Sequence, residues 1–342
     1  MTKNVFFYLS GEHPALPEAE VKAILQAEGI DYAIRMSFPQ VLRLSTDLKA
    51  VPIVGKRAGM THVCGEELFS CNAKIEEIRE ILETGIRLPR KGTFEVRVRR
   101  ILGSSPEISS MDLERLVGRL IERIHPNLRV QLEGADHQFL GLLTSDKFVF
   151  GLVGATIPAK TFEDRRPSKR PFFHPSALIP KFARCMVNLA RPRADEILLD
   201  PFCGTGGLSI EGELIGCKTV SSDIDPRMVR GCKMNLAHYG MSPESVTISD
   251  ARRLPFLHAD AVATDTPFRK STKTFGASMG DLVADFLSNI DRVLPRRRFV
   301  CLSAPQQVRL SEIGVGLGLY LVETYLVYVH RRLTREICVF RR

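Results

Sequence analysis

The sequence lacks the residue patterns of a metal site, a disulfide framework and a membrane span. It has eight cysteines, but no two form a Cys-x-x-Cys pair and none stands near a histidine at zinc-ligand spacing. No run approaches the roughly 18 apolar residues that a spanning helix needs. The stretch from Met1 to Glu12 turns polar too early for a signal peptide. We therefore expect no bound metal, no membrane segment and a reducing, cytoplasmic compartment.

The composition is that of a globular protein with a basic surface. The chain has 342 residues, 44% of them hydrophobic and 25% charged, which predicts about two or three domains. Its formal net charge of +9 suits a polyanionic partner, although many metabolic enzymes are equally basic. Each arginine cluster could also be an ordinary solvated face. The clusters lie at 87–91, 97–100, 165–170, 296–298 and 331–332.

The first half of the chain predicts mixed α and β structure. Apolar spacing predicts helices over 17–27, 72–85 and 110–124, and strand-like runs lie at 5–9, 41–44 and 93–99, with two more within 138–153. The strict alternation over 93–99 places Arg97 and Arg99 together on the exposed face of a strand. A first α+β unit should close before residue 60. The basic, proline-punctuated segment 158–171 is interpreted as a linker.

The second half alternates strands and helices. Strand-like runs at 196–200, 218–222, 246–248 and 261–264 are separated by helical segments, a pattern typical of a parallel sheet covered on both faces. Two final β-rich runs, 320–329 and 336–340, flank a basic turn over 330–335. This half therefore predicts a Rossmann-like α/β domain with a terminal antiparallel hairpin.

A glycine turn follows the first of these strands, in the segment Leu198–Gly207. A lone Gly-x-Gly is a weak signal, because such turns serve phosphates, ribose or packing. Here neither the third glycine of a dinucleotide site nor a Lys-Ser/Thr pair is in place. The string Asp-Pro-Phe-Cys-Gly-Thr-Gly resembles motif I of class I methyltransferases. That resemblance implies contact with the amino acid end of S-adenosylmethionine.

Acidic residues end the next two strands. Asp223 lies some twenty residues beyond the turn, where a carboxylate can accept two hydrogen bonds from a ribose. By resemblance Asp223 is the ribose ligand and Ile224 lies against adenine, while Asp225 is a competitor that could merely cap the following helix. Asp250 is expected to face the adenine amine, with Ala251 beside it.

The segment Thr264–Phe268 resembles the Asp/Asn-Pro-Pro-Tyr/Phe motif of enzymes that methylate exocyclic amines. The lone pair of such an amine is delocalised into the ring, so an acceptor must polarise the N–H groups. Asp265 and the backbone carbonyl after it could each accept one N–H, while Phe268 stacks on the base. Thr266 stands where the motif has its first proline. The carbonyl remains, and from the motif alone Thr266→Pro should be neutral or activating.

A further segment, Arg170–Pro180, resembles the element that closes over the methionine end of the cofactor in this branch of methyltransferases. A lone histidine is more often packed or capping than a ligand. In this context Phe173, His174, Pro175 and Ser176 are expected to contact the cofactor.

Together with the opening segment Leu9–Pro14 and the strand over 93–100, these motifs resemble the archaeal tRNA guanosine-10 N2-methyltransferase family. The resemblance is strong over 170–275 and looser before 160. It implies a ferredoxin-like subdomain (1–55), a THUMP RNA-binding domain (56–157), a linker (158–170) and a Rossmann-like methyltransferase domain (171–342). The implied cofactor is S-adenosylmethionine and the implied partner is tRNA. The implied cofactor contacts also include Asp200, Pro201, Phe202, Gly204, Thr205 and Gly206; the catalytic set is Asp265, Thr266, Pro267 and Phe268.

Three alternatives remain open from the sequence. An adenine N6-methyltransferase would share the last motif, a methyltransferase of another tRNA guanine such as position 6 is the closest rival, and a catalytically weak tRNA-binding module is the third. The sequence also leaves open whether one or two methyl groups are added, and whether a small activating protein partner is needed.

Overall fold

The computed structural model describes residues 2–267, 278–331 and 333–342. It divides the chain into two compact units. The first consists of Met1–Glu18, Ile30–Lys56 and Thr61–Ile157, and the second of Ala19–Gly29, Arg57–Met60 and Pro158–Arg342. Phe268, the last residue of the predicted catalytic motif, lies outside the described residues.

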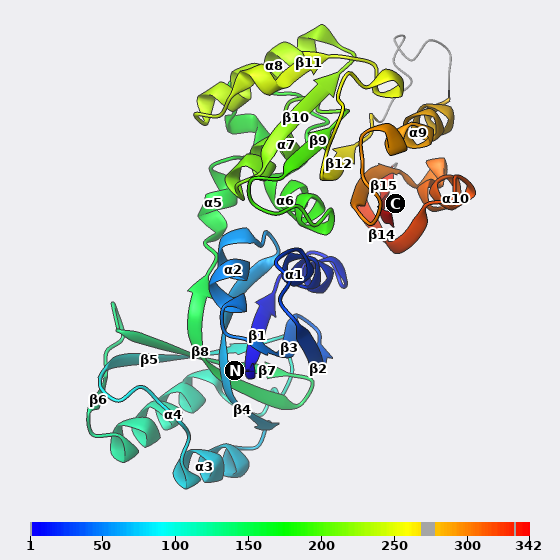
Figure 1. The fold of residues 1–342 in the computed structure, drawn as a ribbon. Coiled ribbons are helices and arrows are strands. Elements are labelled where there is room, and N and C mark those ends of the chain that lie inside the picture. The colour runs from blue at the N-terminus through cyan, green and yellow to red at the C-terminus, as the bar shows by residue number, and fades with distance from the viewer. Residues whose placement is uncertain (1, 268–277, 332) are drawn as a thin grey trace. The chain divides into compact units, whose positions relative to one another are not determined.

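One mixed sheet organises the first unit (Figure 1). Its eight strands have the order β2-β3-β1-β4-β8-β7-β5-β6. The strands are β1 (Thr2–Leu9), β2 (Tyr32–Phe38), β3 (Val41–Asp47), β4 (Thr61–Asn72), β5 (Gly92–Arg100), β6 (Leu128–Val130), β7 (His137–Thr144) and β8 (Lys147–Thr156). The helices of this part of the sequence are α1 (Leu16–Ala27), α2 (Ala50–Arg57), α3 (Ile75–Thr84) and α4 (Ser110–Ile124).

The helices predicted over 72–85 and 110–124 are present as α3 and α4. Both pack on the sheet, where their apolar faces contact a core that includes Phe94, Phe139 and Phe150. The predicted exposure of Arg97 and Arg99 on β5 is confirmed, although Glu95 on the same side of the strand is buried. The first α+β segment is continuous with the rest of this sheet, since β4 pairs with β1 on one side and with β8 on the other.

The segment 158–170 is folded onto the second unit. It contains the short helix α5 (Ala159–Glu163), in which Phe162 is buried. Arg165 makes an ion pair of 2.9 Å with the buried Glu211. The second unit also includes residues from α1 and from the end of α2, where Asn188 donates to Glu20 over 2.8 Å and accepts from Arg57 over 3.2 Å. Early parts of the sequence therefore contribute to its core.

A seven-stranded sheet forms the centre of the second unit, in the order β11-β10-β9-β12-β13-β15-β14. Its first five strands are parallel, and β14 and β15 form the predicted antiparallel hairpin at one edge. The strands are β9 (Ile197–Asp200), β10 (Lys218–Asp223), β11 (Val246–Ile248), β12 (Ala261–Asp265), β13 (Phe299–Pro305), β14 (Tyr320–His330) and β15 (Leu333–Arg341). The Rossmann-like prediction is confirmed.

Helices cover both faces of this sheet. Successive strand residues point to opposite faces, so Leu199 joins the core beneath α9 and α10, whereas Leu198 lies against α7. Burial of these nearly continuous apolar strands is what a parallel sheet requires. The helices are α6 (Pro180–Leu189), α7 (Gly207–Leu214), α8 (Pro226–His238), α9 (Met279–Ser288) and α10 (Leu310–Gly316).

Candidate active site

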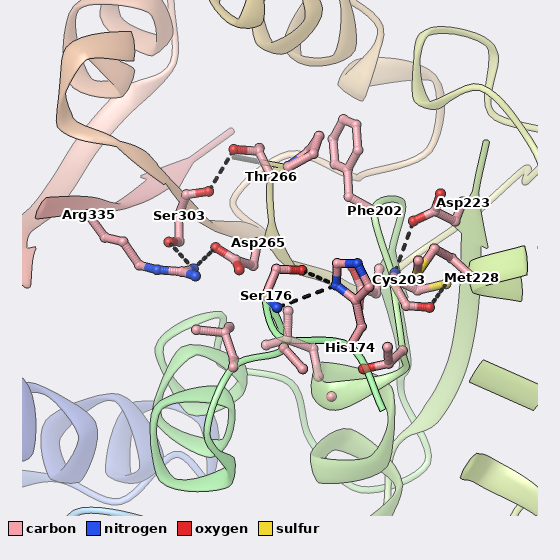
Figure 2. A pocket seen from close by; sticks show the side chains of 18 of the residues that line it. His174, Ser176, Phe202, Cys203, Asp223, Met228, Asp265, Thr266, Ser303 and Arg335 are labelled. Atoms are coloured by element: carbon pink, nitrogen blue, oxygen red, sulfur yellow. Dashed lines mark hydrogen bonds and ion pairs between the residues drawn. The ribbon is translucent and has the colours of Figure 1, made fainter. Parts of the chain in front are cut away.

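A cavity of about 1650 Å³ lies at the carboxyl ends of β9, β10 and β12. In the sheet, β10 lies on one side of β9 and β12 lies on the other. The strand order therefore reverses at β9, and the cavity lies at this point. Open α/β sheets bind their ligands at such a point. Figure 2 shows the motif residues His174, Asp223 and Asp265 around this cavity.

The glycine turn is held to the end of β10 by the side-chain carboxylate of Asp223, which accepts backbone N–H groups. Gly204 donates its N–H to Asp223 Oδ2 over 3.0 Å, and Asp225 donates its N–H to Asp223 Oδ1 over 2.9 Å. Gly206 has φ of 83°, and a Cβ there would lie 2.7 Å from the sulfur of Cys232. Only glycine combines that backbone conformation with so close an approach. Gly206 therefore shapes the turn, although it does not line the cavity.

The two acids that compete for the ribose position have different surroundings. Asp225 is the N-cap of α8, and its side chain accepts the N–H of Arg227 over 2.9 Å. Asp223 ends β10 and does not cap a helix, although both acids line the cavity. Capping accounts for Asp225 as the sequence argument allowed, which leaves Asp223 as the candidate ribose ligand.

Asp250 also lines the cavity, but it is engaged by a neighbour. Its carboxylate accepts from the Arg252 guanidinium at 2.6 and 3.0 Å and caps the 3-10 helix Ala251–Arg253. The Arg252 hydrogen bonds lower the pKa of Asp250. An ionised carboxylate suits a hydrogen-bond acceptor for an adenine amine.

Asp200, at the end of β9, is a buried acid. Its Oδ1 accepts the hydroxyl of Thr264 over 2.6 Å, whereas Oδ2 is buried with no hydrogen-bond partner among the described residues. Burial raises the pKa of Asp200 to about 7. A buried acceptor without a partner is costly, so a cationic or hydrogen-bonding ligand group in the cavity would relieve it.

The segment before α6 contributes one wall of the cavity. His174 Nδ1 lies 2.7 Å from Ser176 Oγ, and the Ser176 N–H lies 3.3 Å from the same nitrogen. His174, Pro175 and Ser176 line the cavity. Phe173 differs, because its side chain is 53% exposed and is not among the lining residues.

Asp265, at the end of β12, is paired with an arginine from the terminal hairpin. Arg335 Nη1 donates to Asp265 Oδ1 and also lies 3.3 Å from Ser303 Oγ on β13, as Figure 2 shows. Burial raises the pKa of Asp265, and the Arg335 guanidinium opposes that shift. The site therefore contains an acceptor for an N–H donor, with a cation beside it.

Thr266 continues the pairing of β12 with β13 beyond the strand end. Its N–H donates to the Ser303 carbonyl over 2.9 Å, and its hydroxyl donates to the same oxygen over 3.0 Å. Thr266 is buried, and Pro267 follows it at the cavity wall. Two hydrogen bonds thus hold the loop at the residue where the motif usually relies on proline.

The cavity brings together most of the residues that the sequence singled out. Phe173 and Gly206 do not line it, and Phe268 is outside the described residues. The predicted residues that line it are His174, Pro175, Ser176, Asp200, Pro201, Phe202, Gly204, Thr205, Asp223, Ile224, Asp250, Ala251, Asp265, Thr266 and Pro267.

Sequence reasoning missed Arg335 and the part played by Ser303. Arg335 was assigned to a basic turn over 330–335, but the strand β15 begins at Leu333 and Arg335 is only 6% exposed. The sequence signal that could have identified Arg335 is its position directly before the apolar strand-like run 336–340. The hairpin residues Tyr328, His330 and Leu333 also line the cavity.

The described ranges contain no helix long and apolar enough to cross a membrane. Within the same ranges, no group of three or more histidine, cysteine or acidic side chains is arranged to hold a metal ion.

Known proteins resemble the chain over its whole length. Residues 167–315 match the RMKL-like methyltransferase domain family. The tRNA (guanine(10)-N2)-dimethyltransferase of Methanothermobacter thermautotrophicus is 35% identical, over 98% of each chain. The protein of the same name from Pyrococcus abyssi is 31% identical, over 96% of this chain and 97% of the relative.

Solved structures support the fold. TrmN from Thermus thermophilus superposes with a TM-score of 0.57 at 20% identity, and the match covers 99% of each chain. The motifs, the cavity at the carboxyl ends of β9, β10 and β12, and the full-length relatives agree, and the chain belongs to the tRNA (guanine(10)-N2)-dimethyltransferase family.

Proposed function

We propose that this protein transfers methyl groups from S-adenosylmethionine to the N2 amine of guanosine 10 in tRNA. The observation that carries the proposal is the placement of Asp265 and Thr266 in one cavity with the glycine turn and Asp223. The names of the full-length relatives support the same substrate. The cytoplasm is the compartment in which we expect this reaction.

The residues of the cavity fit the cofactor at both of its ends. The buried Asp200 Oδ2 lacks a hydrogen-bond partner in the described part of the chain, which suits the ammonium group of a methionine moiety. In this proposal Asp223 accepts ribose hydroxyls, and Ile224, which lines the cavity and is 38% exposed, lies against adenine. S-adenosylmethionine would supply an electrophilic methyl group in this position.

In this proposal Asp265 activates the guanine amine for methyl transfer. Its carboxylate accepts one N–H of the guanine amine, and the backbone carbonyl of Thr266 accepts the other. Withdrawing the nitrogen lone pair from conjugation with the ring makes it a better nucleophile, and the fixed acceptors orient it toward the methyl group. Pro267 lines the cavity beside these acceptors.

We propose that the first unit binds the tRNA, as a ferredoxin-like subdomain followed by a THUMP domain over 56–157. Arg97 and Arg99 lie on the exposed face of β5, where guanidinium groups can contact phosphates. Phosphate contacts position an RNA without reading its sequence. The choice of guanosine 10 then depends on how far the target lies from the docked part of the tRNA.

The decisive experiment is incubation of the purified protein with unmodified tRNA and labelled S-adenosylmethionine. Mass spectrometry of nucleosides and of ribonuclease fragments should give N2-methylguanosine and N2,N2-dimethylguanosine at position 10. N6-methyladenosine, or N2-methylguanosine only at another position such as 6, would replace the proposal by one of its rivals. Binding of tRNA without methyl transfer would leave an RNA-binding module.

A further inference from the structure

Arg335 reaches the predicted catalytic acid from a part of the sequence that carries no recognised motif. It lies on β15, and β13 separates that strand from β12 in the sheet. The Arg335 guanidinium extends across β13. It donates to Asp265 Oδ1 on β12 and to Ser303 Oγ on β13. Arg335 is buried and Asp265 is largely so, since their side chains are 7% and 13% exposed. The pair lines the same cavity as the glycine turn.

The surroundings of Asp265 have opposite effects on the charge of its carboxyl group. Burial disfavours a negative charge there, and the carboxyl of Asp200, on β9 next to β12, adds repulsion when it is ionised. Arg335 is the cation that acts in the other direction, and Ser303 on β13 contributes a neutral hydroxyl. An acid in such a position tends to take up a proton unless a cation stabilises the anion. A protonated Asp265 would be a poor acceptor for an amine N–H.

We propose that Arg335 is a positioning residue that holds Asp265 ionised and oriented toward the cavity, so that the carboxylate can accept the amine of the target base. This inference rests on the proposed function of Asp265. In this role Arg335 acts through the carboxylate of Asp265. The terminal hairpin is thereby part of the catalytic machinery as well as an edge of the sheet.

The test compares the pH dependence of the single-turnover methyl-transfer rate in three variants. Arg335→Met removes the charge and the donors, Arg335→Gln keeps donors without the charge, and Arg335→Lys keeps the charge. We expect the acidic limb of the profile to move upward by about 1–3 pH units in the Met and Gln variants, so that the loss of rate is greatest at the acidic end of the profile. The rate should recover as the pH is raised. Arg335→Lys should retain most of the activity at pH 7.

Arg341→Met is the matched control. Arg341 lies on the same strand, but it packs over the ring of Tyr320 at 5.0 Å and does not line the cavity. Its profile should coincide with that of the wild type. An Arg335→Gln protein that is folded and whose rate is unchanged, or is lowered equally at every pH, would overturn the inference.

A second readout does not depend on turnover. With carbon-13 in the aspartate carboxyl groups, NMR difference spectra against Asp265→Asn identify the Asp265 resonance, and its titration should move upward in Arg335→Gln. If the wild type forms no methylguanosine, the proposed function fails, but this titration still decides the role of Arg335. An Asp265 titration that is the same with and without the Arg335 charge would overturn the inference on its own.

Discussion

Thr264 donates its hydroxyl hydrogen to Asp200 over 2.6 Å, and both side chains are buried. Thr264 directly precedes Asp265 on β12, whereas Asp200 ends β9 at the glycine turn. The hydrogen bond therefore joins the strand that carries the predicted catalytic acid to the strand that leads into the predicted cofactor turn. A substitution at the end of one of these strands should therefore also alter the position of side chains at the end of the other.

Cofactor binding should depend on pH through Asp200. Burial raises its pKa to about 7, and an ammonium group beside it would favour the ionised form. Below about pH 7, binding of the cofactor should therefore release a proton. The cofactor affinity should fall by up to about tenfold for each unit by which the pH is lowered. Calorimetry in buffers of different ionisation enthalpy measures both quantities. Asp200→Asn should bind weakly without this dependence; a wild-type affinity that is constant from about pH 6 to about pH 8 would contradict the assignment.

Asp223→Ala should weaken S-adenosylmethionine binding by about 2–3 kcal/mol, because a charged hydrogen-bond partner of the ribose is lost. The matched control is Asp225→Ala, two residues away. It removes the cap of α8, so it should cost about 1 kcal/mol of folding stability and leave the cofactor affinity nearly unchanged. Equal affinities for the wild type and a folded Asp223→Ala protein would remove Asp223 from the ribose site.

Asp265→Ala should lower the methyl-transfer rate by about a hundredfold or more, while the affinities for cofactor and tRNA stay nearly constant. Asp265→Asn should be milder, because the amide oxygen still accepts an N–H. Single-turnover rates are needed so that product release does not mask the chemistry. Since Asp265→Ala also leaves Arg335 buried without its carboxylate, folding should be checked by thermal unfolding. A fully active Asp265→Ala enzyme would show that the amine is activated elsewhere.

Thr266→Pro has a different expected outcome from the one that the motif alone suggests. Proline would remove the N–H and the hydroxyl that both donate to the Ser303 carbonyl. We expect the free energy of unfolding to fall by about 1–3 kcal/mol, with slower methyl transfer as the loop loses its anchor. Thr266→Val, which keeps the N–H, should lose less stability. A Thr266→Pro protein as stable and active as the wild type would favour the motif argument.

Replacement of Arg99 by glutamine should weaken tRNA binding and lower the slope of log affinity against log salt by about one. Arg309→Gln, an equal change of charge on an exposed residue of the second unit, is the comparison. A point substitution is preferable to deletion of residues 1–160, because residues from α1 and α2 belong to the second unit and contact Asn188. An unchanged salt slope in Arg99→Gln would place the phosphate contacts elsewhere.

The sequence by itself determined the class of the second unit and most of its cavity. The strand-helix alternation and the motifs at 198–207, 223–225 and 264–268 are local, and parallel topology brings the carboxyl ends of such strands together. The hairpin and the helices α3 and α4 were equally predictable, because a regular apolar period depends only on neighbours in the chain.

Only the tertiary structure decided which residues complete the site. β2 and β4 were not predicted: β2 is an edge strand whose centre is exposed, and β4 has no simple alternation of buried residues. β13, also unpredicted, pairs Ser303 with Asp265 on one side and Pro305 with Arg335 on the other. The contact of Arg335 with Asp265 depends on the register between β13 and β15. Register is set by pairing between distant segments, so a pattern within either segment cannot reveal it.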